Sequence, residues 1–170
     1  MALAVPLRGS RFLARRGSAF FVRPTGIMQD PLKRLIAELH SAFFKPNGFK
    51  KERTRFCRTV DTAVQEMLFQ SSRWNSADSP ISFSIYVYLG FTDIPRQDGG
   101  QSFASMGHIA GLVPGRPPLF PLTPHNYEAT KKQILEWLPQ AVAEWPKHYE
   151  DVRRLLKSAG GSNVIYCGYK

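Results

Sequence analysis

The sequence predicts an α+β fold, in which an antiparallel β meander of about four to five strands carries an N-terminal helix and C-terminal helices packed on one face. Three observations indicate it. Apolar residues recur at three- and four-residue steps over 31–44, alternate strictly with polar residues over 81–91, and return to helical spacing after the prolines of 114–124. The expected strands succeed one another through short connections, which favours antiparallel pairing because parallel strands need long crossovers.

The expected first helix covers residues 31–44. Asp30 suits the N-cap because its carboxylate accepts hydrogen bonds from free N–H groups, and Pro31 suits the first helical position. The apolar stripe of this helix consists of Leu32, Leu35, Ile36, Leu39 and Phe43. A Pro-Asn-Gly sequence at 46–48 ends the helix.

The expected sheet occupies the middle of the chain. Residues 54–60 and 63–71 read as two strands joined by a turn at Asp61 and Thr62. The alternation over 81–91 predicts a strand with one face on the core and the other nearer water. Glycine-containing turn residues come next, and a further strand is expected within 102–113.

Helices are expected to close the fold. The five prolines of 114–124 predict an ordered crossover or a surface loop that pairs with no central strand. A helix begins at Thr123 and Pro124, and we expect Pro139 and Pro146 to divide the rest of the chain into short helical pieces. The residues expected to face inward are Tyr127, Ile134, Trp137 and Leu138.

Length and composition indicate one domain, residues 28–170, preceded by an extension. The chain has 170 residues, 43% of them hydrophobic, and its longest apolar runs are too short to span a membrane. Residues 1–27 hold five arginines and no acidic residue, so half of the net charge of +10 lies there. We expect this extension to be disordered or processed, with an over-extended start before Met28, a mitochondrial transit peptide and a twin-arginine signal as open interpretations. The expected location is cytoplasmic, with targeting by 1–27 left open.

Several short motifs resemble a known family. They are Gly48-Phe49-Lys50-Lys51 followed by Phe56, then residues 68–74 (Leu-Phe-Gln-Ser-Ser-Arg-Trp), then the alternating strand that ends Leu89-Gly90-Phe91. In order and spacing, residues 30–150 resemble the bacterial family called domain of unknown function 4304. The resemblance implies the same order of an N-terminal helix and strands, and it implies no activity. Immunity proteins encoded beside toxins are an analogy of type for small α+β proteins of this kind.

The sequence predicts no catalytic, cofactor-binding or metal-binding residue. Nucleophile and phosphate-loop motifs are absent, and the four histidines lack metal-ligand spacing. Cys57 lies among arginines that would lower a thiol pKa, but a buried inert cysteine is the better interpretation. If the chain has a pocket between sheet and helices, we expect Asp93, Asp98 and His108 in its wall.

A polar and aromatic surface is the other candidate site. Basic residues crowd 45–58, where Arg53 and Arg55 are expected on one strand face with Cys57. The expected interaction surface consists of Arg53, Arg55, Arg73, Trp74, Tyr86 and Tyr88. Trp and Arg are enriched at binding hot spots, and aromatic rings beside positive charge also suit single-stranded nucleic acid.

Three functions are compatible with these patterns, in order of preference. The first is a non-enzymatic module that binds another protein, of immunity or accessory type. The second is an enzyme or small-ligand binder with a pocket between sheet and helices. The third is nucleic-acid binding through residues 45–58.

Overall fold

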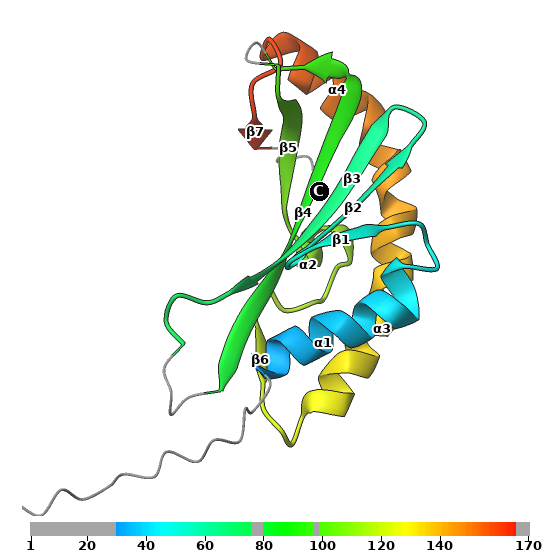
Figure 1. Cartoon of the computed structure of the whole chain (residues 1–170). Helices are drawn as coiled ribbons and strands as arrows, with labels where there is room; N and C mark the ends of the chain where they lie inside the picture. The colour runs from blue at the N-terminus through cyan, green and yellow to red at the C-terminus, as the bar shows by residue number, and fades with distance from the viewer. Residues whose placement is uncertain (1–29, 76–79, 97–98, 166–170) are drawn as a thin grey trace, which may run out of the picture.

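The computed structural model describes residues 30–75, 80–96 and 99–165, and it confirms the α+β class. The strands are β1 (Lys50–Glu52), β2 (Arg55–Val60), β3 (Ala63–Ser71), β4 (Ile81–Pro95), β5 (Gln101–His108), β6 (Phe120–Leu122) and β7 (Val164–Ile165). They form one sheet in the order β1-β2-β3-β4-β5-β7, with β6 paired to the first residues of β4 (Figure 1). All pairs are antiparallel except β5–β7, so the expected meander forms the larger part of a mixed sheet.

Residues 114–124 were expected to form an ordered crossover or a surface loop outside any central strand, and three of them form the short edge strand β6 instead. Pro121 lies opposite Ser82 within the β4–β6 pair. Because β4 is the longest strand and its first residues extend past the end of β5, they leave a free edge there, and an edge strand tolerates proline. The strand expected within 102–113 ends at His108, where the short helix α2 (Ile109–Leu112) begins.

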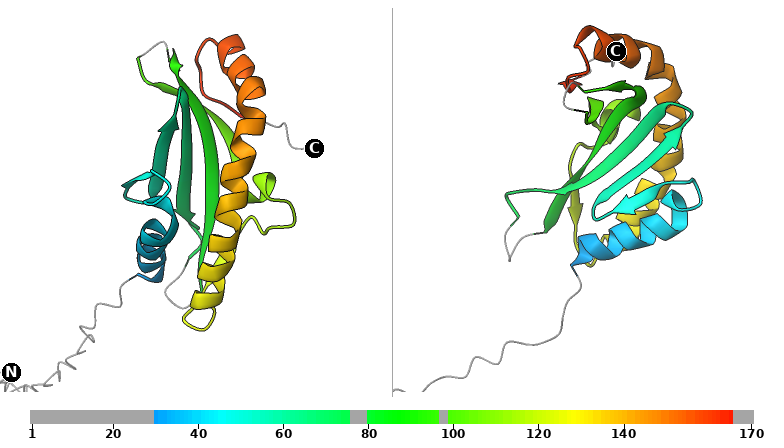
Figure 2. Two further views of the ribbon diagram at one scale, coloured as in Figure 1. Left: turned by 90° about the vertical axis from the view of Figure 1, so that its right-hand side faces the viewer. Right: turned by 45° about the horizontal axis from the view of Figure 1, so that its top comes forward.

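The helices lie together on one face of the sheet. They are α1 (Pro31–Leu39), the π-helical turn η1 (His40–Phe44), α3 (Tyr127–Glu144), the 3-10 turn η2 (Trp145–His148) and α4 (Tyr149–Ser158). The left panel of Figure 2 looks at α3 with the strands behind it. Pro139 was expected to end a helix, but α3 continues through it, because Pro139 is exposed while Trp137, Leu138 and Ala141 remain buried on the other side. Among the described residues, no helix is both long and apolar enough to cross a membrane.

An aromatic cluster fills the core between α1 and the sheet. The Phe44 ring stacks on Phe56 with 3.8 Å between centroids, and its other ring neighbours are Phe43, Phe49 and Phe69, which it meets edge to face. Met67, Ile85 and Leu89 continue this core along the same face of β3 and β4. Period-two alternation therefore determines which side of the sheet receives the helices.

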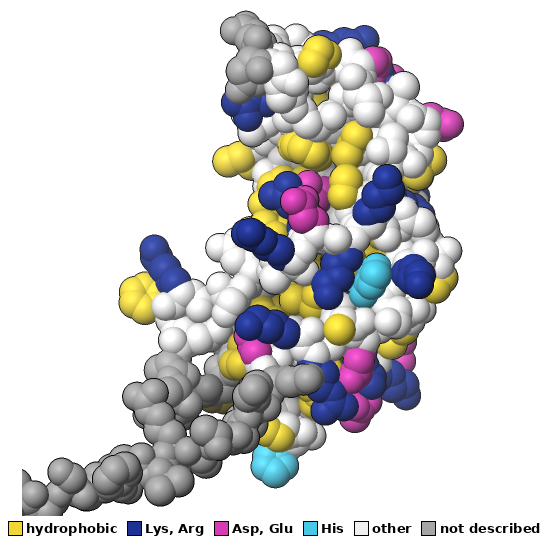
Figure 3. All heavy atoms as spheres, in the orientation of Figure 1, with side chains coloured by type: hydrophobic (Ala, Val, Ile, Leu, Met, Phe, Trp, Pro, Cys, Tyr) yellow, Lys and Arg dark blue, Asp and Glu magenta, His cyan; other side chains and the backbone are white. Residues whose placement is uncertain are grey.

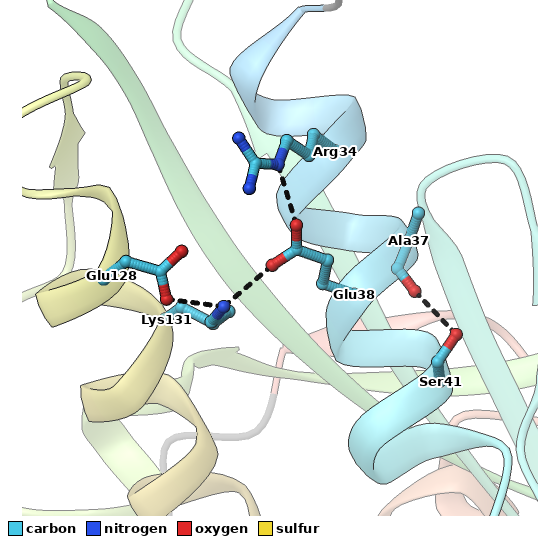
Figure 4. A network of polar contacts seen from close by, with 6 residues as sticks. All are labelled: Arg34, Ala37, Glu38, Ser41, Glu128 and Lys131. Carbon is cyan, nitrogen blue, oxygen red and sulfur yellow. Dashed lines mark hydrogen bonds and ion pairs between the residues drawn. The ribbon is translucent and has the colours of Figure 1, made fainter.

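A polar network joins α1 to α3 at the surface (Figure 4). The Glu38 carboxylate accepts from Arg34 Nε at 2.7 Å and from Lys131 Nζ at 2.9 Å, and Lys131 also pairs with Glu128 at 2.6 Å. Arg34 and Lys131 both lie over the Tyr127 ring. Burial, more than any neighbouring charge, raises the pKa of Tyr127 to about 12. Since Glu38 bridges cations from two helices, it orients α1 on α3.

A candidate binding site on the uncovered face of the sheet

Within the described residues, the second face of the sheet is not covered by the long helices, although Ser84 at one end of it donates to the Pro118 carbonyl at 2.8 Å, and the face has a hollow of about 240 Å³. The strand register places alternate residues of β2 to β5 on this face. The hollow is lined by Arg55, Glu66, Leu68, Tyr88, Phe103, Ser105, Asn163 and Val164. Four adjacent strands and the segment that enters β7 therefore contribute to a single depression.

Glu66 is the unusual residue of this hollow. It is only 5% exposed although it lies on the face that the long helices leave uncovered. Its carboxylate forms an ion pair with Arg55 Nε at 3.3 Å, and it makes no hydrogen bond to any residue in the described part of the chain. Burial raises the pKa of Glu66 above its ordinary value, and Arg55 opposes the shift. The fully enclosed polar atoms without a hydrogen bond in the described residues do not include the Glu66 oxygens, so these oxygens remain open to solvent and to a ligand that enters the hollow.

The groups beside Glu66 stay protonated at neutral pH. Burial raises the pKa of Tyr88, and Glu66 raises it further. Burial also raises the pKa of the Cys57 thiol, and Glu66 adds to the effect, while Arg55 lowers the pKa by less, which agrees with the preferred interpretation of an inert cysteine. The reason is that Cys57 lies opposite Glu66 in the β2–β3 pair, where it is half-buried. A protonated thiol is a poor nucleophile.

One wall of the hollow is held by a glycine turn. Ser102 Oγ donates to the Gly161 carbonyl, and Phe103 N donates to Asn163 Oδ1 at 3.0 Å. Gly161 has φ +77°, and a Cβ there would collide with the Pro95 carbonyl oxygen. The segment that carries Asn163 and Val164 can therefore lie against β5 only with glycine at 161.

We expect Gly161→Ala to destabilise the protein and to loosen this wall. An L-residue in the left-handed region costs about 1–2 kcal/mol, and the collision adds to that cost. Urea unfolding measures the first effect, and amide hydrogen exchange of Asn163 and Val164 measures the second. Gly99→Ala is the matched control, because Gly99 also has positive φ but nothing lies near its would-be Cβ. Equal loss and unchanged exchange in both variants would contradict the packing role of Gly161.

The expected interaction surface is brought together in part. Arg55 and Tyr88 line the hollow. Tyr86, also on this face, lies opposite His108, with 4.4 Å between ring centroids. Arg53 was expected on the strand face with Arg55, but it lies in the β1–β2 turn with φ +56°.

The other expected site residues lie apart from the hollow. Trp74 is 79% exposed beside Arg73 in the β3–β4 connection, with the guanidinium 5.0 Å from the ring centroid. Asp93 pairs with Arg153 of α4 at 2.5 Å, seven residues along β4 from the partner of His108. At about 3.3 Å per strand residue, that separates Asp93 from His108 by on the order of 20 Å, too far for the two to share one small pocket. Asp98 lies outside the described residues.

Comparisons with known proteins give no family for the chain: no family model matches it, and neither the curated proteins nor the solved structures searched contain a match. The resemblance to domain of unknown function 4304 therefore stays a prediction. Among the described residues, no three His, Cys, Asp or Glu side chains gather as a metal site would require.

Proposed function

We propose that this chain is a non-enzymatic module that binds a partner protein on the uncovered face of its sheet, with an Arg or Lys side chain of the partner entering the hollow. The observation that carries the proposal is the buried Glu66 carboxylate, which has an ion pair but no hydrogen bond within the described residues. A guanidinium or ammonium group supplies the missing donors and compensates the buried charge.

The lining of the hollow suits the whole length of such a side chain. Leu68, Phe103 and Val164 provide apolar surface for the methylene stem. The Tyr88 ring and the Ser105 hydroxyl also line the hollow, and aromatic rings attract cations. Arg55 is half-exposed, so it can turn outward when a second cation approaches Glu66.

A binding role fits the residues better than the enzyme alternative. The pocket considered for an enzyme or small-ligand binder would have Asp93, Asp98 or His108 in its wall, and Asp93 is engaged by Arg153. Cys57 and Tyr88 are held protonated by burial, so neither supplies a nucleophile or base at neutral pH. Recognition of a cation requires only the acceptor that Glu66 provides.

The test uses a minimal probe, N-acetyl-arginine amide, titrated into the protein and followed by amide chemical shifts. We expect shifts at Glu66, Leu68, Tyr88 and Ser105 with a dissociation constant in the millimolar range, because one side chain makes few contacts. The citrulline analogue has the same shape without the charge and is expected to shift these signals far less.

Matched variants separate the hollow from general attraction to acidic residues. Glu66→Gln should abolish the shifts, whereas Glu52→Gln should keep them, since Glu52 is an exposed glutamate of β1. Equal shifts with citrulline, or equal loss in both variants, would overturn the proposal. Binding of free n-butylamine as tightly as the arginine probe would point to a small amine as the ligand in place of a partner protein.

A further inference from the structure

A second group of charges lies where η1 meets the β1–β2 hairpin, apart from the hollow. We call His40, Lys45 and Lys51 the basic corner. The His40 ring stacks on Phe56 with 5.8 Å between centroids, and Lys51 lies opposite Phe56 in the β1–β2 pair. Both therefore adjoin the same buried ring from different elements. In Figure 3, basic side chains lie on both sides of a His side chain on the face that is shown.

The π-helical turn adds Lys45 to this group. The Lys45 N–H donates to the His40 carbonyl at 2.8 Å, which is the five-residue hydrogen bond of a π-turn. Residues joined by a helical hydrogen bond lie one turn apart on the same side, so the π-turn places Lys45 beside His40, where an α-turn would place Phe44. Phe44 is instead free to face the core, where it is fully buried. π-turns of this kind are frequent at functional sites.

The basic corner has no acidic counterpart. Lys45 and Lys51 are exposed and form no ion pair with any described residue. Burial lowers the pKa of His40 the most, and the charges of Lys51 and then of Lys45 lower it further. No carboxylate acts in the opposite direction on this pKa. By contrast, Arg55 faces Glu66, and Arg58 is occupied by Gln65 and the Asn47 carbonyl. Within residues 45–58, Arg55 and Arg58 therefore contact other residues of the fold, whereas Lys45 and Lys51 form no ion pair with a described residue.

We infer that the basic corner binds a phosphate group, held by the two lysine ammonium groups and the His40 imidazole. A phosphate dianion offers oxygen acceptors to all three groups at once and removes the repulsion among them. Phe56 fixes the plane of the His40 ring, so the imidazole is oriented before the ligand arrives. This site is independent of Glu66 and of the partner proposed for the hollow.

The test follows the His40 ring signals by NMR during pH titrations of the full chain in inorganic phosphate and in sodium chloride of equal ionic strength. We expect a higher His40 pKa in phosphate, because a bound anion favours the protonated ring, and by linkage phosphate binds more tightly as the pH falls. An equal His40 pKa in the two salts would overturn the inference.

Variants identify the residues responsible. The double variant Lys45→Gln/Lys51→Gln should lose the phosphate effect and should raise the His40 pKa in chloride, since two repelling charges are removed. Lys132→Gln, an exposed lysine of α3, is the control and should change neither. A phosphate effect that survives the double variant would overturn the assignment.

A last arm distinguishes the source of the phosphate. If a short oligothymidylate raises the His40 pKa more than phosphate does, and its affinity falls linearly on a log–log salt plot, the ligand is a nucleic-acid backbone. If only phosphate monoesters act, the ligand is a small phosphorylated molecule. Either result supports a phosphate site, and failure of both probes excludes it.

Discussion

Phe44→Ala is expected to lower the free energy of unfolding by about 3–5 kcal/mol, a large part of the roughly 5–15 kcal/mol that stabilises a typical domain. Phe44 is fully buried, stacks on Phe56 and meets three further phenylalanine rings edge to face. Its removal leaves a cavity where α1, η1 and the sheet meet. Urea unfolding followed by circular dichroism and tryptophan fluorescence measures the change.

Phe103→Ala is the control for this variant. Phe103 is also a phenylalanine of the fold, but it is half-buried on the uncovered face of the sheet. Because less apolar area returns to water, we expect its loss to cost less than half as much. Comparable losses at the two positions, or a loss below about 1 kcal/mol for Phe44→Ala, would contradict the packing described for the core.

Regular periodicity is what made the fold predictable. The strand expected over 63–71 has those bounds in the structure, and the alternation over 81–91 identifies the core face of β4. The apolar stripe of 31–44 likewise identifies the buried side of α1. Each pattern repeats over many residues, so local sequence carries enough information to determine both the element and its orientation.

Elements that depend on distant partners were not predictable in this way. β6 and β7 have three and two residues, and they form because β4 and β5 leave edges for them. α3 continues past Pro139 because tertiary packing of its buried side outweighs one lost hydrogen bond. The π-turn at His40 is also invisible to a pattern search, since it changes the register of the helix by a single residue.

The candidate site was predicted only in part. Arg55 and Tyr88 could be chosen from strand alternation, but Glu66 was missed. A signal existed: Glu66 lies between Val64 and Leu68 on one strand face, and an acid flanked by apolar residues on the same face is unusual. The hollow itself could not be predicted from the sequence, because residues from β2, β5 and the segment before β7 meet only in the folded sheet.

Glu66→Gln is expected to stabilise the protein at neutral pH by about 1 kcal/mol while removing the proposed binding activity. Because burial raises its pKa, Glu66 binds its proton more tightly in the folded chain than in the unfolded chain. The stabilisation it contributes is therefore present below the ordinary glutamate pKa and is lost as the pH rises through the raised value. A glutamine at this position cannot ionise. The fall in the free energy of unfolding that Glu66 causes as the pH rises should therefore be absent from the variant.

Urea unfolding of the wild type and of Glu66→Gln from acidic to neutral pH tests the expected direction of this pH dependence. The two free energies should be similar at the acidic end and should separate as the pH rises, with the variant the more stable. Glu52→Gln removes one negative charge from an exposed position and should keep the decline with rising pH, moved slightly to lower pH because Glu52 adds to the raised pKa of Glu66. If Glu66→Gln is instead the less stable protein at neutral pH, the ion pair with Arg55 is structural, and the hollow holds no carboxylate reserved for a partner.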